Sequence, residues 1–285
     1  MLLRLPKGGP EHQAVEAGEI DAIIDYAGSN VILLPAARRA LREAANRAPA
    51  AKRDPANQAT IANSLLASLP HAEYQRLLAR LEPVTLKFGE VLHEAGVPIR
   101  YVYFPNDCAI SLLTAVEGHQ ALEVGLVGHE GMVGIPLALG IDVSFLRALV
   151  RGTGTAMRME SAALREEIPQ SKPLQQALFR YQHALTGQIA QFAVCNQFHS
   201  GQARLARYLL MTADCARSSE FHLTHAFLAH MLGVRRAGIT LAASALQKRG
   251  LIKYRRGEIT LLDRKRLTAA SCECYRIIKR IYEGA

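Results

Sequence analysis

The spacing of hydrophobic residues changes several times along the chain, and each spacing predicts a different element. Between residues 58 and 82, leucines recur on one helical face, at positions 65, 66, 69, 77, 78 and 81. From residue 84 to about 159, short β-rich runs alternate with glycine-bearing turns, at 84–88, 101–104, 109–113 and 122–127. Many short strands at this spacing predict a small β-roll or barrel.

The first 57 residues differ from this pattern. Two short apolar runs, at 22–25 and 31–34, flank the turn-forming residues 27–30 and predict a β-hairpin. Residues 36–48 are rich in strong helix formers and predict a helix, and 47–57, with Pro49 and Pro55, read as a linker. The sequence assigns no role to this segment.

The longest helical pattern begins at Pro173 and ends near His199. Its apolar face repeats in alternating steps of four and three, which is a heptad seam typical of a helix that pairs with a second copy. The alternative is an ordinary amphipathic helix packed on its own domain. The predicted dimer-helix residues are Leu174, Leu178, Tyr181, Leu185, Gln188, Phe192 and Cys195.

The last 85 residues carry the pattern of a winged helix-turn-helix. A helix at 203–213 is followed by one that Thr224 caps and Gly233 ends, and by a second one that Gly250 ends. Two helices joined by a short glycine-bearing turn are the DNA-binding helix-turn-helix arrangement. Two short strands around Arg256 and Gly257 then predict a β-hairpin wing.

This arrangement predicts which side chains meet DNA. The outward N-terminal end of the second helix holds the expected base-reading residues Arg235, Arg236 and Thr240. The expected phosphate contacts lie at the helix ends and the wing, and they are Thr224, Ser244, Lys248, Lys253, Arg255 and Arg256.

The distribution of charge supports a polyanion as partner. The 285 residues carry a net charge of +9. Residues 201–285 hold 16 Lys and Arg against 6 Asp and Glu, whereas the other 200 residues hold 18 against 19. One end of the chain therefore carries the whole excess, as expected for a double-stranded DNA-binding module.

Composition also bears on location. No apolar run reaches the roughly 18 residues that a membrane span requires, and the first residues lack the features of a signal peptide. The five scattered cysteines are typical of a reducing compartment, so a cytoplasmic protein without membrane contact is expected.

The order of these parts resembles the Crp/Fnr family of bacterial transcription regulators. The resemblance covers about residues 60–270 and rests on the stretches 88–96, 101–104, 223–236, 246 and 250–252. It implies a homodimer that places two recognition helices on a near-palindromic operator, with Arg236 as the guanine-reading arginine. The following family glutamate is Ala237 here, and a second family arginine is Leu241.

The sensor half departs from the family pattern. Cyclic-nucleotide binders hold the ribose with Gly-Glu and the phosphate with Arg-Ser or Arg-Thr, and the corresponding pairs here are Gly134-Ile135 and Arg147-Ala148. Because Ile135 and Ala148 lack the required polar groups, cyclic AMP binding in the usual mode is not expected. Arg147, Gly134 and Ile135 remain the candidate residues for an unknown effector.

Two other classes of function remain as alternatives. A cupin-like metal enzyme would use His93, Glu94, His119, His129 and Glu130, but the roll has no His-x-His. A protein-interaction adaptor would not bind DNA. No metal or other cofactor is expected: Cys272 and Cys274 lie two apart on an expected terminal helix, where they would point in different directions, so packing or redox sensitivity is the favoured interpretation.

The sequence therefore predicts an α+β regulator rather than an enzyme. Its expected parts are an N-terminal extension (1–57), a cupin-like β-roll sensor domain (58–165), a long dimerisation helix (166–200) and a winged helix-turn-helix (201–285). RNA polymerase would be a further partner if the protein activates transcription.

Overall fold

The computed structural model describes residues 22–25, 30–33, 63–115 and 121–284. The chain divides into two compact units between Thr60 and Ile61. In the first unit, β1 (Ala22–Asp25) pairs antiparallel with β2 (Asn30–Leu33), which confirms the two predicted strands. The helix expected at 36–48 and the linker at 47–57 lie outside the described residues.

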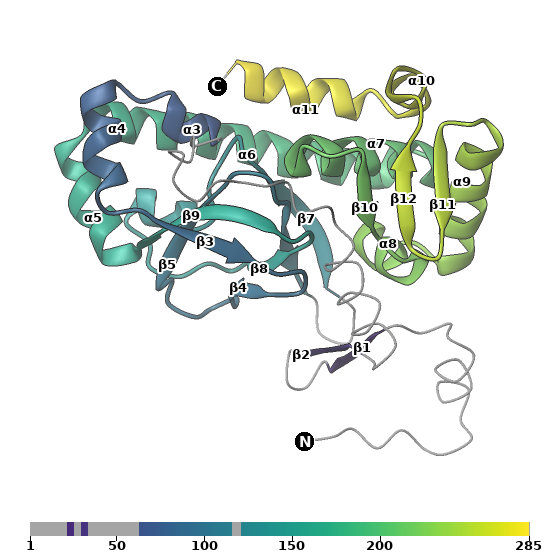
Figure 1. Ribbon diagram of the computed structural model, residues 1–285, viewed down its shortest axis with the longest axis horizontal. Coiled ribbons are helices and arrows are strands. Elements are labelled where there is room, and N and C mark those ends of the chain that lie inside the picture. The colour runs from purple at the N-terminus through teal and green to yellow at the C-terminus, as the bar shows by residue number, and fades with distance from the viewer. Residues whose placement is uncertain (1–21, 26–29, 34–62, 116–120, 285) are drawn as a thin grey trace, which may run out of the picture. The chain divides into compact units, whose positions relative to one another are not determined.

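Two antiparallel sheets form a β-roll at the start of the second unit (Figure 1). One sheet has the order β3-β9-β5 and the other the order β4-β8-β6-β7, with a short 3-10 helix between β7 and β8. The elements are β3 (Glu82–Leu86), β4 (Val91–His93), β5 (Tyr101–Pro105), β6 (Ile110–Thr114), β7 (Leu122–Val127), η1 (Ile135–Leu139), β8 (Arg147–Val150) and β9 (Gly154–Glu160). The four predicted strands are confirmed, whereas β4, β8 and β9 were not predicted.

The helical character predicted between residues 58 and 82 is confirmed for the described part of this segment, which holds two helices. They are α3 (Ser64–Ala67) and α4 (His71–Leu78), and Pro70 lies between them. Proline has no backbone N–H to continue the helical hydrogen bonds, so α3 does not run on into α4, and Pro70 is the N-cap of α4. Asn63 caps α3 and donates its amide to Pro105 O and Gly131 O, which fixes the helix to the roll.

Two helices follow the roll, α5 (Ser161–Gln170) and α6 (Lys172–Phe198). Ser171 caps α6 by accepting a hydrogen bond from Leu174 N at 3.2 Å. The side-chain amide of Gln188 accepts from Leu126 N and donates to Leu126 O, so it pairs with β7 much as another strand would. The predicted long helix is therefore present, and it is fastened to the roll along its length.

The predicted dimer seam needs a correction. All seven residues of that seam are buried within one chain, and they are Leu174, Leu178, Tyr181, Leu185, Gln188, Phe192 and Cys195. A Cβ added to Gly131 would lie 2.0 Å from the Tyr181 ring, which shows how closely this face packs on its own domain. The heptad spacing marks an amphipathic helix buried in its own chain, so this face is not available to a second copy.

The C-terminal part begins with α7 (Gly201–Ala216) and continues through the predicted helix-turn-helix and wing (Figure 1). Its further elements are β10 (Glu220–His222), α8 (His225–Leu232), α9 (Arg236–Lys248), β11 (Ile252–Arg255), β12 (Glu258–Leu261), α10 (Arg264–Ala270) and α11 (Cys274–Glu283). Leu113, Leu126 and Leu149 of the roll belong to the same buried cluster as Leu205 and Leu209 of α7. The roll and the C-terminal part therefore share one core.

A buried ion pair lies in this shared core. The Arg151 side chain is 0% exposed and its Nη1 lies 2.7 Å from the Glu123 carboxylate, both in the roll. Arg151 Nη2 donates to the Thr212 hydroxyl of α7 at 3.0 Å, and the guanidinium lies 4.2 Å from the centre of the Tyr208 ring. One side chain thus connects the roll to the first helix of the C-terminal part.

Replacing Arg151 by alanine should destabilise the protein by about 3–5 kcal/mol, because Glu123 would remain buried without its partner. Urea unfolding would measure the loss. The control is Arg165→Ala, which breaks an exposed pair with Asp142 and should cost less than about 1 kcal/mol. Equal losses in the two variants would contradict the importance of the buried pair.

Candidate nucleic-acid interface

Local sequence signals place the two helices of the helix-turn-helix. Thr224 caps α8, since its hydroxyl accepts from Phe227 N at 3.2 Å. Gly233 ends α8 in the left-handed conformation, with φ of 61°, which glycine adopts without strain. After the short turn, α9 begins at Arg236 and ends at Lys248.

The outer face of α9 is exposed over most of its length. Ile239, Ala242, Ala243 and Leu246 are buried and anchor the helix, as the sequence predicts. The opposite face holds the exposed side chains of Arg235, Arg236, Thr240, Leu241, Ser244 and Lys248. A Cβ added to Gly238, on the same face, would have no atom of the chain within 4 Å.

His225 supports this face, and sequence reasoning missed it. Its Nδ1 lies 3.1 Å from the Thr240 hydroxyl, and its ring stacks on Tyr254 of the wing at 4.4 Å between centroids. The Thr240 hydroxyl also donates to Arg236 O at 3.2 Å. Since a hydroxyl has one proton, both contacts form when His225 Nδ1 is the donor. The sequence feature that could have indicated this role is the position of His225 directly after the Thr224 cap.

The wing is a β-hairpin with a two-residue turn. Arg255 pairs with Glu258 across the turn, and Arg256 and Gly257 occupy it with φ of 51° and 86°. Two consecutive positive φ values define the hairpin turn that matches the twist of the flanking strands. The side chains of Lys253 and Arg255 in β11 and of Arg256 in the turn are exposed.

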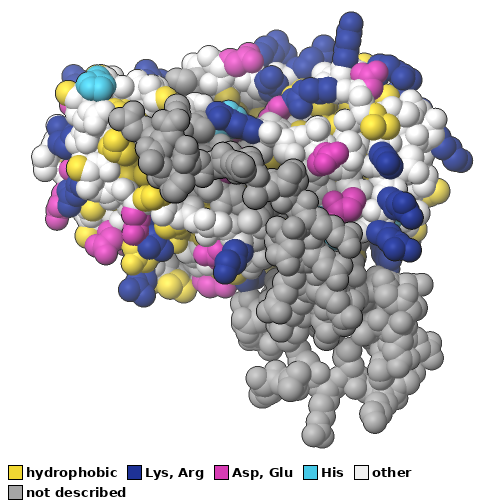
Figure 2. All heavy atoms as spheres, in the orientation of Figure 1, with side chains coloured by type: hydrophobic (Ala, Val, Ile, Leu, Met, Phe, Trp, Pro, Cys, Tyr) yellow, Lys and Arg dark blue, Asp and Glu magenta, His cyan; other side chains and the backbone are white. Residues whose placement is uncertain are grey.

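Cations on this surface are left without partners. Among the described residues, no carboxylate forms an ion pair with Arg235, Arg236, Lys248, Lys253, Arg255 or Arg256, whereas arginines elsewhere, such as Arg76, Arg80, Arg151 and Arg158, are paired. Figure 2 shows Lys and Arg side chains gathered toward the right-hand edge, over the region labelled α9, β11 and β12 in Figure 1. Such a surface attracts a polyanion.

The candidate effector residues lie in the roll but are occupied by contacts within the chain. Gly134 precedes η1 with φ of 101°, and a Cβ there would lie 2.7 Å from the Val102 side chain. Ile135 is buried. Arg147 Nε lies 3.2 Å from the Glu94 carboxylate, so an anion would compete with that pair.

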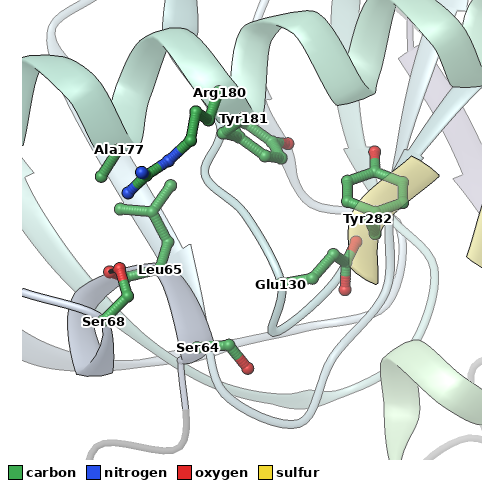
Figure 3. Close-up of a pocket in the computed structure, with 8 residues that line it drawn as sticks. All are labelled: Ser64, Leu65, Ser68, Glu130, Ala177, Arg180, Tyr181 and Tyr282. Carbon is green, nitrogen blue, oxygen red and sulfur yellow. Dashed lines mark hydrogen bonds between the residues drawn. The ribbon is translucent and has the colours of Figure 1, made fainter. Parts of the chain in front are cut away.

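A pocket of about 210 Å³ lies elsewhere, among α3, α6 and α11 (Figure 3). Glu130, Tyr181 and Tyr282 stand on one side of it, and Arg180 stands on another. Burial raises the pKa of the Glu130 carboxyl and favours its neutral form. None of the candidate effector residues lines this pocket.

The described part of the roll holds no group of residues that could bind the metal ion of a cupin-like enzyme. Among the described residues, the only group of three or more ligand-type side chains close enough to share an ion is Cys195, His199, Cys272 and Cys274. The expectation that Cys272 and Cys274 share a helix is wrong, because α11 begins at Cys274 and Cys272 lies in the preceding turn.

Comparison with known proteins supports this arrangement. Residues 203–270 match the Crp-like helix-turn-helix domain family. No curated protein matches the chain. Within the described residues, no helix has the length and apolar character needed to cross a bilayer.

Solved structures share the fold beyond the matched domain. A transcriptional regulator of the Crp/Fnr family from Eubacterium rectale is 18% identical, with a TM-score of 0.56 over 72% of this chain and 96% of that one. FixK2 from Bradyrhizobium japonicum is 14% identical, with a TM-score of 0.57 over 67% and 98% of the two chains. The c-di-GMP-responsive regulator CLP from Xanthomonas campestris is 16% identical, with a TM-score of 0.55 over 68% and 100%. At these identities the likeness is one of fold.

A β-roll is joined by a long helix to a basic winged helix-turn-helix, an arrangement typical of DNA-binding transcription regulators. Residues 203–270 belong to the Crp-like helix-turn-helix domain family, and the fold of the chain is similar to that of Crp/Fnr regulators.

His225 should titrate below its ordinary pKa of 6.5, because burial and then the nearby charge of Arg236 disfavour the charged ring. The stability that the neutral ring supplies should be complete above pH 6.5 and decline as pH falls through the lowered pKa. An NMR titration of the His225 ring resonance, assigned by its loss in His225→Asn, measures the midpoint. A midpoint at or above 6.5 would contradict the packing described for this ring.

Proposed function

We propose that the protein is a sequence-specific regulator that binds a near-palindromic operator as a homodimer. The observation that supports this most strongly is the surface of α9 and the wing, whose cations form no ion pair with a carboxylate of the described residues. Leaving cations unpaired on one face is unfavourable by itself, because they repel one another, and it becomes favourable when phosphates neutralise them.

The residues on this surface divide into two roles. Arg235, Arg236 and Thr240 lie at the N-terminal end of α9, where a recognition helix meets base edges in the major groove. An arginine can pair with guanine through two hydrogen bonds, which suits Arg236. The residues at the helix ends and on the wing are proposed to hold phosphates, and they are Thr224, Ser244, Lys248, Lys253, Arg255 and Arg256.

A second face of α6 suits the homodimer. Exposed residues recur in steps of four and three on the side away from the buried seam, and they are Phe179, His183, Thr186, Ala190, Ala193 and Gln197. Phe179 and Val194 are 49% and 46% exposed, which is high for large apolar side chains on a long helix. We therefore assign the dimer contact to this outer face.

The effector is proposed to differ from cyclic AMP bound in the usual mode. Ile135 and Ala148 are buried apolar residues at the positions where that mode needs polar groups, and Arg147 is already paired with Glu94. CLP is described as c-di-GMP-responsive, so this dinucleotide belongs beside cyclic AMP in a ligand screen. RNA polymerase becomes a partner if the regulator activates transcription, and the cytoplasm is the proposed location.

Replacing Arg236 by alanine should cost about 1–3 kcal/mol on the specific site and little on scrambled DNA, because the lost contact reads a base. Lys253→Ala should instead weaken both duplexes alike and reduce the salt slope by about one. Fluorescence anisotropy across a salt series, with labelled DNA from upstream of the protein's own gene, measures both. Equal losses on the two duplexes for Arg236→Ala would overturn its base-reading role, and absence of binding at low salt would favour the adaptor.

Ala190→Glu should convert the homodimer to a monomer, since it brings like charges together across the outer face of α6. Sedimentation velocity measures the oligomeric state. Leu139→Glu is the control, because Leu139 is 51% exposed on η1 and should leave the dimer intact. A dimer that survives Ala190→Glu would place the contact elsewhere.

A further inference from the structure

Four ligand-type side chains from distant parts of the chain meet where α6 ends. Cys195 and His199 come from the last turns of α6, Cys272 from the turn between α10 and α11, and Cys274 from the first position of α11. Their ligand atoms all lie within 4.8 Å of one another. The three cysteines are 0%, 5% and 0% exposed, so the thiols face each other rather than solvent.

The distances within this cluster suit a tetrahedral ion. Cys195 Sγ lies 3.5 Å from Cys272 Sγ, and Cys274 Sγ lies 3.4 Å from His199 Nδ1. Ordinary zinc bond lengths place two sulfurs about 3.8 Å apart and a sulfur and a nitrogen about 3.6 Å apart at the corners of a tetrahedron. These two distances therefore differ from those of a zinc site by only a few tenths of an ångström.

Groups around the cluster hold the ligands as metal sites require. The other nitrogen of His199, Nε2, lies 3.2 Å from the Glu273 carboxylate, which orients the ring with Nδ1 toward the thiols. The Gln191 amide donates to Cys274 Sγ at 3.1 Å. These contacts match the outer shell of a histidine-containing zinc centre.

A buried positive charge stands beside the thiols without a carboxylate. Arg207 of α7 is 2% exposed, and among the described residues no Asp or Glu forms an ion pair with it. Arg207 lies close enough for its charge to act on Cys195 and Cys272. Since a buried charge needs compensation, a centre with net negative charge would explain its place.

We propose that Cys195, His199, Cys272 and Cys274 bind one Zn²⁺ as a closed structural site. Three thiols release their protons to water on binding, and three thiolates with a neutral imidazole give the centre a net charge of −1. Soft thiolates in a four-ligand set favour zinc over harder ions, and four protein ligands leave no open position for catalysis.

The site would fasten the C-terminal helix to the long helix. α11 lies along α6 (Figure 1), where Gln188 Nε2 donates to Tyr282 OH at 2.9 Å. A Cβ added to Gly187 would lie 3.2 Å from Ile281, so glycine permits the close approach. The ion would secure the first residues of α11 where α6 ends and α7 begins.

The test measures zinc in the full chain, purified without an affinity tag under reducing conditions. Mass spectrometry of the metal content should give about one zinc per chain, and Cys272→Ser and His199→Asn should lose it. Cys108→Ser is the matched control, since Cys108 is also buried but lies outside the cluster, and it should keep its zinc. Cobalt in place of zinc should give the absorption of a tetrahedral thiolate site, weakened in Cys272→Ser.

A milder variant separates weakened zinc binding from misfolding. Glu273→Gln keeps all four ligands and should weaken zinc binding about 10–100-fold in competition with a chelator. Glu283→Gln, at the exposed far end of α11, should leave the affinity unchanged. Protein that binds no zinc when the ion is supplied, equal affinity in the two glutamine variants, or a Cys195–Cys272 disulfide in the purified chain would each overturn the proposal.

Discussion

The buried pair of Arg151 and Glu123 is the interaction on which the junction between sensor and DNA-binding parts depends. Two charges removed from water are costly unless they satisfy each other, so Arg151, which follows β8, and Glu123 of β7 must stay in contact. The same guanidinium reaches Thr212 and Tyr208 of α7. A movement of the roll relative to α7 would break these contacts together, which makes this junction a natural place for a signal to pass between the parts.

The surface of α9 and the wing follows the opposite rule. Arg151 and Glu123 match each other at the junction, whereas Arg235, Arg236 and the wing cations have no carboxylate partner among the described residues. Specific contacts hold the elements beneath these cations. Thr224 caps α8, and His225 contacts both Thr240 and Tyr254. A rigid support under unsatisfied charge is what a binding surface for an external anion requires.

The long helix α6 has two faces with different partners. One face is buried against the roll and α11, with Gln188 contacting both β7 and Tyr282. The other face is exposed from Phe179 to Gln197 and is open to a second copy. α11 packs on α6 and therefore connects this helix to the C-terminal part. The matched domain ends at residue 270 and does not include α11.

The sequence by itself determined the features that depend on neighbours in the chain. Thr224 and Gly233 set the ends of α8, Arg256 and Gly257 set the wing turn, and short β-rich runs between glycine-bearing turns set four strands of the roll, because caps, turns and strand propensity act over a few residues. Tertiary structure alone decided which face of α6 is buried, that Cys272 lies outside a helix and meets Cys195 across 77 positions, and that Arg151 finds Glu123. A heptad spacing fixes which residues share a face but not what covers that face, and only the folded chain brings distant partners together.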